Sequence, residues 1–163
     1  MLTTAAIIGV GMGKIAPISK DLLIEGVVCS TKGSLGHIGN IFGSSNRASI
    51  NGILEIQELL RRLDTEAEVS VIEAYISEIN NTVLNTDTSK SSCLALHNVS
   101  TALKELDDEL YEIFNKIDCG ANTTWLGSWW YGYPDFTPNS QKLQNKMKIL
   151  QQRFSLYMRL SGK

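Results

Sequence analysis

Residues 96–117 read LHNVSTALKELDDELYEIFNKI, and this stretch decides the fold. Its large aliphatic residues return at alternating intervals of three and four positions. The members of the series are Leu96, Val99, Leu103, Leu106, Leu110, Ile113 and Ile117. A repeat of about 3.5 residues places such side chains on one narrow stripe of an α-helix, and that stripe must be hidden against another helix. The stretch therefore predicts a long helix within a helical bundle.

Shorter series with the same spacing lie on both sides of this stretch. They consist of Ile53, Ile56, Leu60 and Leu63; of Val69, Ile72, Ile76, Ile79 and Val83; and of Leu143, Met147, Leu150, Phe154 and Tyr157. Four amphipathic segments in one chain are typical of a four-helix bundle or of paired helical hairpins. We therefore expect an all-α domain with heptad seams over residues 46–163.

Local signals suggest where these helices begin and end. Asn46 is a candidate first residue, and Thr65-Glu66-Ala67-Glu68 matches a capping box, in which Glu68 would reach back to the N-cap amide. Cys119-Gly120 offers a glycine at a plausible helix end. Thr137-Pro138 resembles an N-cap followed by proline in the first turn. These signals predict four helices joined by connections of mixed length.

The last two expected helices carry opposite charge. The acidic residues of the earlier one are Glu105, Asp107, Asp108, Glu109 and Glu112, and the basic residues of the later one are Lys142, Lys146, Lys148, Arg153 and Arg159. Antiparallel packing would bring these charges together beside one seam. Each exposed pair would stabilise the contact by only a few tenths of a kcal/mol, so the charges indicate pairing and not function.

Residues 1–45 differ from the rest of the chain in composition. They hold eight of the thirteen glycines, short β-branched apolar runs and Pro17. Glycine at this density weakens a helix, and the short apolar runs suit extended structure. We therefore expect a Gly-rich apolar N-terminal arm, extended or folded as a β-hairpin. Its apolar side chains need cover from the helical part or from another molecule.

An aromatic loop is expected at residues 120–137. It contains all three tryptophans of the chain, and its candidate partner-binding residues are Trp125, Trp129, Trp130, Tyr131, Tyr133 and Phe136. Three interpretations are open: the rings close one end of the bundle, they form a hot spot for another protein, or they lie at a membrane interface.

The sequence does not match the motifs for catalysis or cofactor binding that it resembles in part. Gly9-Val10-Gly11-Met12-Gly13-Lys14 lacks the first glycine and the hydroxyl residue of a phosphate-binding loop. Neither His37 nor His97 follows a glutamate by three positions, as a di-iron helix would require. The three cysteines include no CxxC pair. We therefore expect a non-enzymatic protein with no catalytic residue, no cofactor and no metal.

The bulk composition favours a protein that acts through its surfaces. The chain has 163 residues, 43% of them hydrophobic, and a net charge of −2, which gives no general attraction to nucleic acid. Its N-terminus is a poor signal peptide, so we expect an intracellular reducing compartment or a particle assembled there. The leading hypothesis is a minor subunit of a large assembly, such as a virion shell, with a cement or bridging role. It would form homo- or hetero-oligomers with other protein subunits. The alternative is a peripheral membrane adaptor that contacts lipid through residues 1–30 and the aromatic loop.

Overall fold

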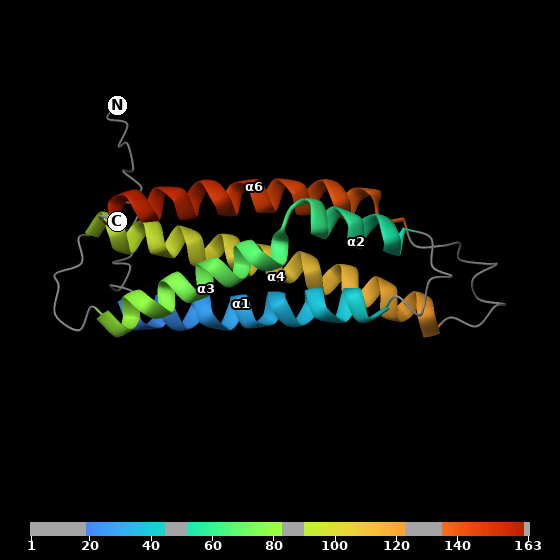
Figure 1. Cartoon of the computed structure of the whole chain (residues 1–163), viewed down its shortest axis with the longest axis horizontal. Helices are drawn as coiled ribbons and strands as arrows, with labels where there is room; N and C mark the ends of the chain where they lie inside the picture. Colours follow the sequence, from blue (N-terminus) through green and yellow to red (C-terminus); the bar gives the residue numbers. More distant parts are fainter. Residues whose placement is uncertain (1–18, 45–51, 83–89, 123–134, 162–163) are drawn as a thin grey trace, which may run out of the picture.

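The computed structural model describes residues 19–44, 52–82, 90–122 and 135–161 as an assembly of helices (Figure 1). The helices are α1 (Lys20–Gly43), α2 (Ile53–Arg62), α3 (Thr65–Thr82), α4 (Lys90–Asn122) and α6 (Thr137–Leu160). Within these four ranges no residue belongs to a strand. The predicted all-α class is therefore confirmed for the described part of the chain.

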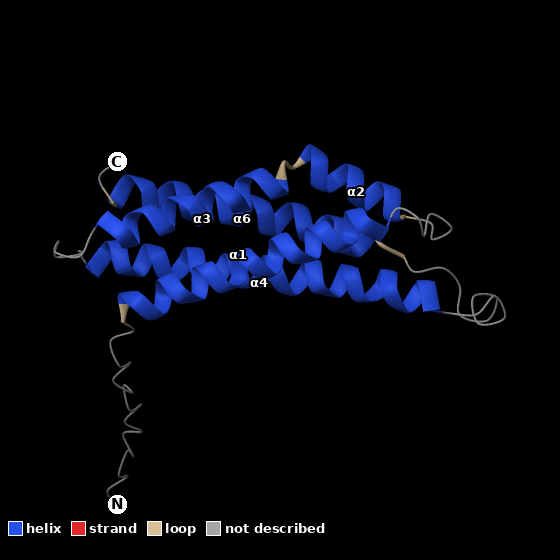
Figure 2. Ribbon diagram, turned by 60° about the horizontal axis from the view of Figure 1, so that its bottom comes forward, coloured by secondary structure: helices blue, strands red, loops and turns tan. Residues whose placement is uncertain are grey.

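The helices lie side by side along the long axis of the molecule (Figures 1 and 2). α4 packs against α1 on one side and α6 on the other, and α3 packs against α1. α1 and α4 run in the same direction, because Gly26 faces Ser100 and Gly33 faces Asp107 at the same sequence offset. α4 and α6 run in opposite directions, since Ser92 at the start of α4 bonds to Leu160 at the end of α6.

The core follows the predicted heptad stripe of α4 closely. All seven side chains of the series from Leu96 to Ile117 are buried. On α6, Leu143, Met147, Leu150 and Tyr157 are buried in the same core. The ion pairs of Lys142 with Glu109 and Glu112 join the acidic and basic helices, with N–O distances of 3.8 and 3.7 Å. The predicted antiparallel pairing of these two helices is confirmed.

The prediction of an extended or hairpin arm over residues 1–45 is wrong for residues 20–43, which form α1. The Ser19 hydroxyl caps this helix by accepting a hydrogen bond from the Leu22 amide. One face of α1 then enters the core through Leu23, Ile24, Val27, Ile38 and Ile41. Burial of this aliphatic stripe outweighs the low helix propensity of the glycines, because packing supplies most helical stability in proteins. Residues 1–18 lie outside the described residues.

Several predicted helix ends are also corrected. The capping box is not formed, because Thr65 is the first residue of α3 and its buried hydroxyl has no hydrogen-bond partner. The chain instead bends at Asp64, whose φ of 49° lies in the left-handed region. α4 continues through Gly120 to Asn122, since one glycine costs a helix only about 1 kcal/mol. α6 begins at Thr137 itself, with Phe136 at the N-cap, and Asn46 lies outside the described residues.

Replacing a glycine of α1 by alanine is expected to have opposite effects on stability at different positions of the helix. A Cβ atom at Gly33 would lie 2.7 Å from both carboxylate oxygens of Asp107, whereas one at Gly36 or Gly39 would meet nothing within 4 Å. Alanine stabilises a helix over glycine by about 0.5–1 kcal/mol. We expect Gly36→Ala and Gly39→Ala each to raise the free energy of unfolding in urea by about this amount. Gly33→Ala should lower it, and adding Asp107→Ala should remove that loss.

Candidate interaction site

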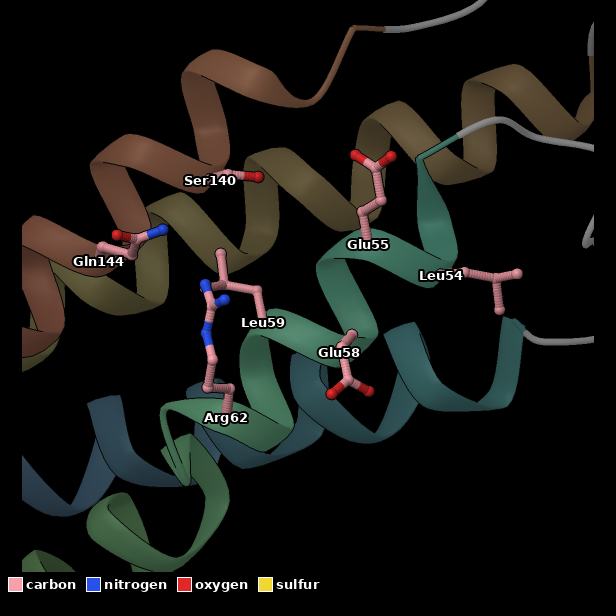
Figure 3. Close-up of a pocket in the computed structure, with 7 residues that line it drawn as sticks. All are labelled: Leu54, Glu55, Glu58, Leu59, Arg62, Ser140 and Gln144. Atoms are coloured by element: carbon pink, nitrogen blue, oxygen red, sulfur yellow. The ribbon is translucent and has the colours of Figure 1, made fainter.

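An open groove of about 460 Å³ lies between α2 and α6. Figure 3 shows side chains from both helices around this space, with Leu59 and Arg62 extending from α2 toward the side of α6. The lining residues are Leu54, Glu55, Glu58, Leu59, Arg62, Ser140 and Gln144. An aliphatic floor with a charged and polar rim is suited to holding an apolar side chain of another segment.

The side chains that α6 presents to α2 differ from those that it presents to α3. Farther along the bundle, Tyr75 of α3 packs edge-on against Phe154 and Tyr157 of α6, with ring centroids 5.5 and 6.2 Å apart. These large rings fill the space between α3 and α6. Opposite α2, α6 instead presents Ser140 and Gln144, and these two side chains line the open groove. Within the described residues, the groove is therefore a space that the packing of α2 against α6 leaves open.

Charged groups surround the groove on the α2 side. Glu58 pairs with Arg61 at 3.7 Å, and the Arg61 guanidinium lies 5.0 Å from the centre of the Phe42 ring on α1. Leu54 points away from α6 and is 63% exposed (Figure 3). An exposed leucine beside acidic side chains favours a protein surface as the occupant over a small molecule, since small-molecule sites enclose most of their ligand.

Of the six predicted aromatic residues, only Phe136 belongs to the described residues. Phe136 is buried, and its ring packs over Gly52 at the start of α2, where a Cβ atom would lie 2.8 Å from the ring. Gly52 has a φ of 93°, which other residues rarely adopt. For Phe136 the structure thus favours the interpretation in which a ring closes the core. Trp125, Trp129, Trp130, Tyr131 and Tyr133 lie outside the described residues.

A second cluster of chemically active groups joins α1 to α4. His37 Nε2 lies 3.7 Å from Asp107 Oδ1, and the Ser34 hydroxyl donates to the same oxygen at 3.4 Å. The His37 ring also packs near Tyr111, with centroids 5.4 Å apart, and its buried Nδ1 has no hydrogen-bond partner. Serine and histidine both turn toward the aspartate and not toward each other. This geometry positions two helices and does not activate the serine as a nucleophile.

The Asp107 carboxyl makes the stability of the α1–α4 contact depend on pH. Burial raises the pKa of Asp107 above its ordinary value, and this shift is opposed by His37 and by the hydrogen bond from Ser34. A carboxyl with a raised pKa stabilises the fold below its unfolded pKa, and this contribution is lost as the pH rises through the folded pKa. We expect Asp107→Asn to become more stable than the unchanged protein as the pH rises from acid to neutral. Urea unfolding at several pH values in this range measures the difference in free energy of unfolding. Asp108→Asn is the control for the lost charge, because Asp108 is exposed.

A third polar group lies buried between α4 and the first turn of α6. The Asn139 amide donates to Glu109 Oε1 at 2.7 Å, and its oxygen accepts a hydrogen bond from Lys116. Glu109 and Asn139 are both buried, whereas the Lys142 ammonium that faces Glu109 is largely exposed. Sequence analysis placed Glu109 on the acidic face of its helix but missed Asn139. No spacing rule identifies an asparagine that becomes buried only when two helices meet.

The described residues form an all-α assembly with an open groove between α2 and α6. Within the four described ranges, no group of three or more His, Cys, Asp or Glu side chains is placed to hold a metal ion. None of the helices described combines the length and apolar character needed to cross a bilayer. Comparison with protein families, curated proteins and solved structures found no match. A functional proposal therefore depends on the chain's own residues.

Proposed function

We propose that this chain is a non-enzymatic structural subunit that binds other protein subunits, copies of itself among them. Its framework in this proposal is a four-helix bundle in which α2 and α3 together take one of the four positions. The observation that carries the proposal is the open groove between α2 and α6, floored by Leu59 and bordered by exposed Leu54. An open groove with an aliphatic floor and a polar rim on a helical surface is suited to an apolar side chain of a partner.

The aromatic residues of the segment between α4 and α6 are a second argument for a partner contact at the end of the bundle where α2 begins. Residues 123–134 join α4 to α6, and Phe136, just after this segment, packs on Gly52 where α2 begins. Tryptophan and tyrosine dominate the residues that contribute most to protein–protein binding. We propose that Trp129 and Trp130 contribute to the contact next to the groove. A cement or bridging role in a large particle such as a virion shell is the specific form of this proposal.

The test is the mass of the purified full chain in solution, measured by light scattering over a range of concentrations. We expect oligomers that grow with concentration, and we expect Trp129→Ala with Trp130→Ala to yield monomers that unfold at the same urea concentration. Tyr111→Ala, which removes an exposed aromatic ring from the α1–α4 side, should leave the oligomers intact. A monomer at every concentration would contradict self-association, and unfolding of the double tryptophan variant would assign the rings to the core.

Membrane binding is the competing outcome. The adaptor hypothesis expected lipid contact through residues 1–30, but Leu23, Ile24 and Val27 of α1 are buried against the other helices. These three side chains therefore cannot insert into a bilayer while the bundle stays folded. Flotation of the chain with lipid vesicles, in the absence of any protein partner, would favour the adaptor over the subunit.

A further inference from the structure

α1 and α4 begin, and α6 ends, at the end of the molecule opposite the groove (Figure 1). Four leucines near these helix ends are exposed. Leu22 and Leu94 are each 62% exposed, Leu156 is 46% exposed and Leu160 is 43% exposed. We call these four residues the leucine patch. Single exposed leucines are ordinary, but apolar side chains gathered on one surface indicate a binding site.

Printed contacts between the helices bring the four residues to one surface. The Ser92 hydroxyl donates to the Leu160 carbonyl at 3.1 Å, so the first turn of α4 lies beside the last turn of α6. Arg153 of α6 donates to the Asn98 carbonyl of α4 at 3.1 Å. Residues three or four positions apart share one side of a helix. Leu94, four positions before Asn98, and Leu156, three positions after Arg153, therefore border the same α4–α6 seam.

Leu22 lies across α4 from this seam. Gly26 of α1 faces Ser100 of α4, where an added Cβ atom would lie 3.1 Å from the serine hydroxyl. Leu22 is four residues before Gly26 and therefore on the same side of α1. The first turns of α4 thus lie between Leu22 on one side and Leu156 and Leu160 on the other. The patch spans the outer surface of three helices.

The N-terminal segment of the chain has the composition and the length to cover this patch. Residues 1–18 join α1 at Ser19, one turn before Leu22. Their only charged side chain is that of Lys14, and their large aliphatic residues are Leu2, Ile7, Ile8, Val10, Ile15 and Ile18. Eighteen extended residues reach up to about 60 Å, whereas three packed helices are only about 20 Å across from axis to axis.

We propose that residues 1–18 dock onto the leucine patch of their own chain, with Ile7 and Ile8 against the α4–α6 seam. The covalent connection gives this segment an effective concentration of about millimolar at the patch, which a free partner of equal affinity would have to match. The aliphatic side chains of the segment then lose their contact with water together with the four leucines. This contact is independent of the proposed function, because the groove lies at the other end of the bundle.

The test places a photoreactive benzoylphenylalanine at position 156 of the full chain and identifies the crosslinked peptide by mass spectrometry. Trypsin releases residues 1–14 as one peptide, since Lys14 is the first basic residue. We expect position 156 to capture this peptide within single chains, about tenfold more than the same probe at position 71. Val71 on α3 is a matched control, because it is also aliphatic and 57% exposed.

A pair of variants then separates docking from chance contact. Ile7→Asp with Ile8→Asp should abolish the crosslink from position 156, whereas Thr3→Asp with Thr4→Asp adds the same charge and should keep it. The bundle itself should unfold at an unchanged urea concentration in both variants. Crosslinks from position 156 to a second copy, to another part of the chain, or to no peptide would each overturn the proposal.

Discussion

Leu106→Ala is expected to lower the free energy of unfolding by about 2–5 kcal/mol, the range found when a buried leucine is cut to alanine. Leu106 lies in the middle of α4 with no exposed surface, and the helices on both sides of α4 contribute to the core around it. Removing its branched methyl groups forfeits their burial and leaves a cavity that neighbouring helices fill only in part. Urea unfolding followed by circular dichroism measures the loss.

Leu54→Ala makes the same chemical change at a side chain that is 63% exposed. It should alter the free energy of unfolding by no more than about 0.5 kcal/mol, as surface substitutions usually do. The two variants therefore compare the same leucine-to-alanine change at a buried position and at an exposed one. Equal losses in both would show that the stripe of α4 does not form the centre of the core.

The stripe of α4 could be predicted because the spacing of its aliphatic residues reports burial directly. A helix that buries one stripe needs apolar residues at intervals of three and four. From Leu96 to Ile117 this series has no gap, and no glycine or proline interrupts it. Every residue of the series is buried in the structure. The opposite charges of the two helices indicated the antiparallel partner of this helix, and Lys142 pairs with Glu109 and Glu112 across the contact.

α1 was missed because glycine content was given more weight than spacing. Leu23, Val27, Ile38 and Ile41 follow helical intervals, with Thr31 and Ser34 at the buried positions between them. Small polar residues at those positions interrupted the apolar pattern, although both are buried. Ser19 and Asp21 were a further signal, as an N-cap followed by an acidic first turn.

The groove between α2 and α6 could not be predicted from the sequence. It is lined by Ser140 and Gln144 on one side and by Leu59 on the other, from two helices that are distant in the chain. No periodicity reveals which helices meet, or where their side chains fail to fill the space between them. Phe136 shows the same limit, since its burial depends on the absence of a side chain at Gly52.

Asn139→Ala is the second substitution with a large expected effect. Glu109 is 3% exposed, and the Asn139 amide is the buried donor to its carboxylate. Without that donor, the one partner that Glu109 keeps among the described residues is Lys142 at 3.8 Å, whose side chain is 55% exposed. Leaving a buried charged acceptor without its hydrogen bond costs about 2–4 kcal/mol. Urea unfolding should show this loss, although alanine favours the helix more than asparagine does.

A double variant shows whether the loss comes from the carboxylate of Glu109 that Asn139→Ala leaves without its donor. Glu109→Leu with Asn139→Leu removes the acceptor and the donor together, so it should unfold nearly as the unchanged protein does, because apolar groups replace a buried polar pair at little net cost. Glu112→Ala removes the other, exposed carboxylate that pairs with Lys142, and should cost less than about 1 kcal/mol. If the double leucine variant lost as much stability as Asn139→Ala, the cause would be the packing of the first turn of α6 and not the buried charge of Glu109.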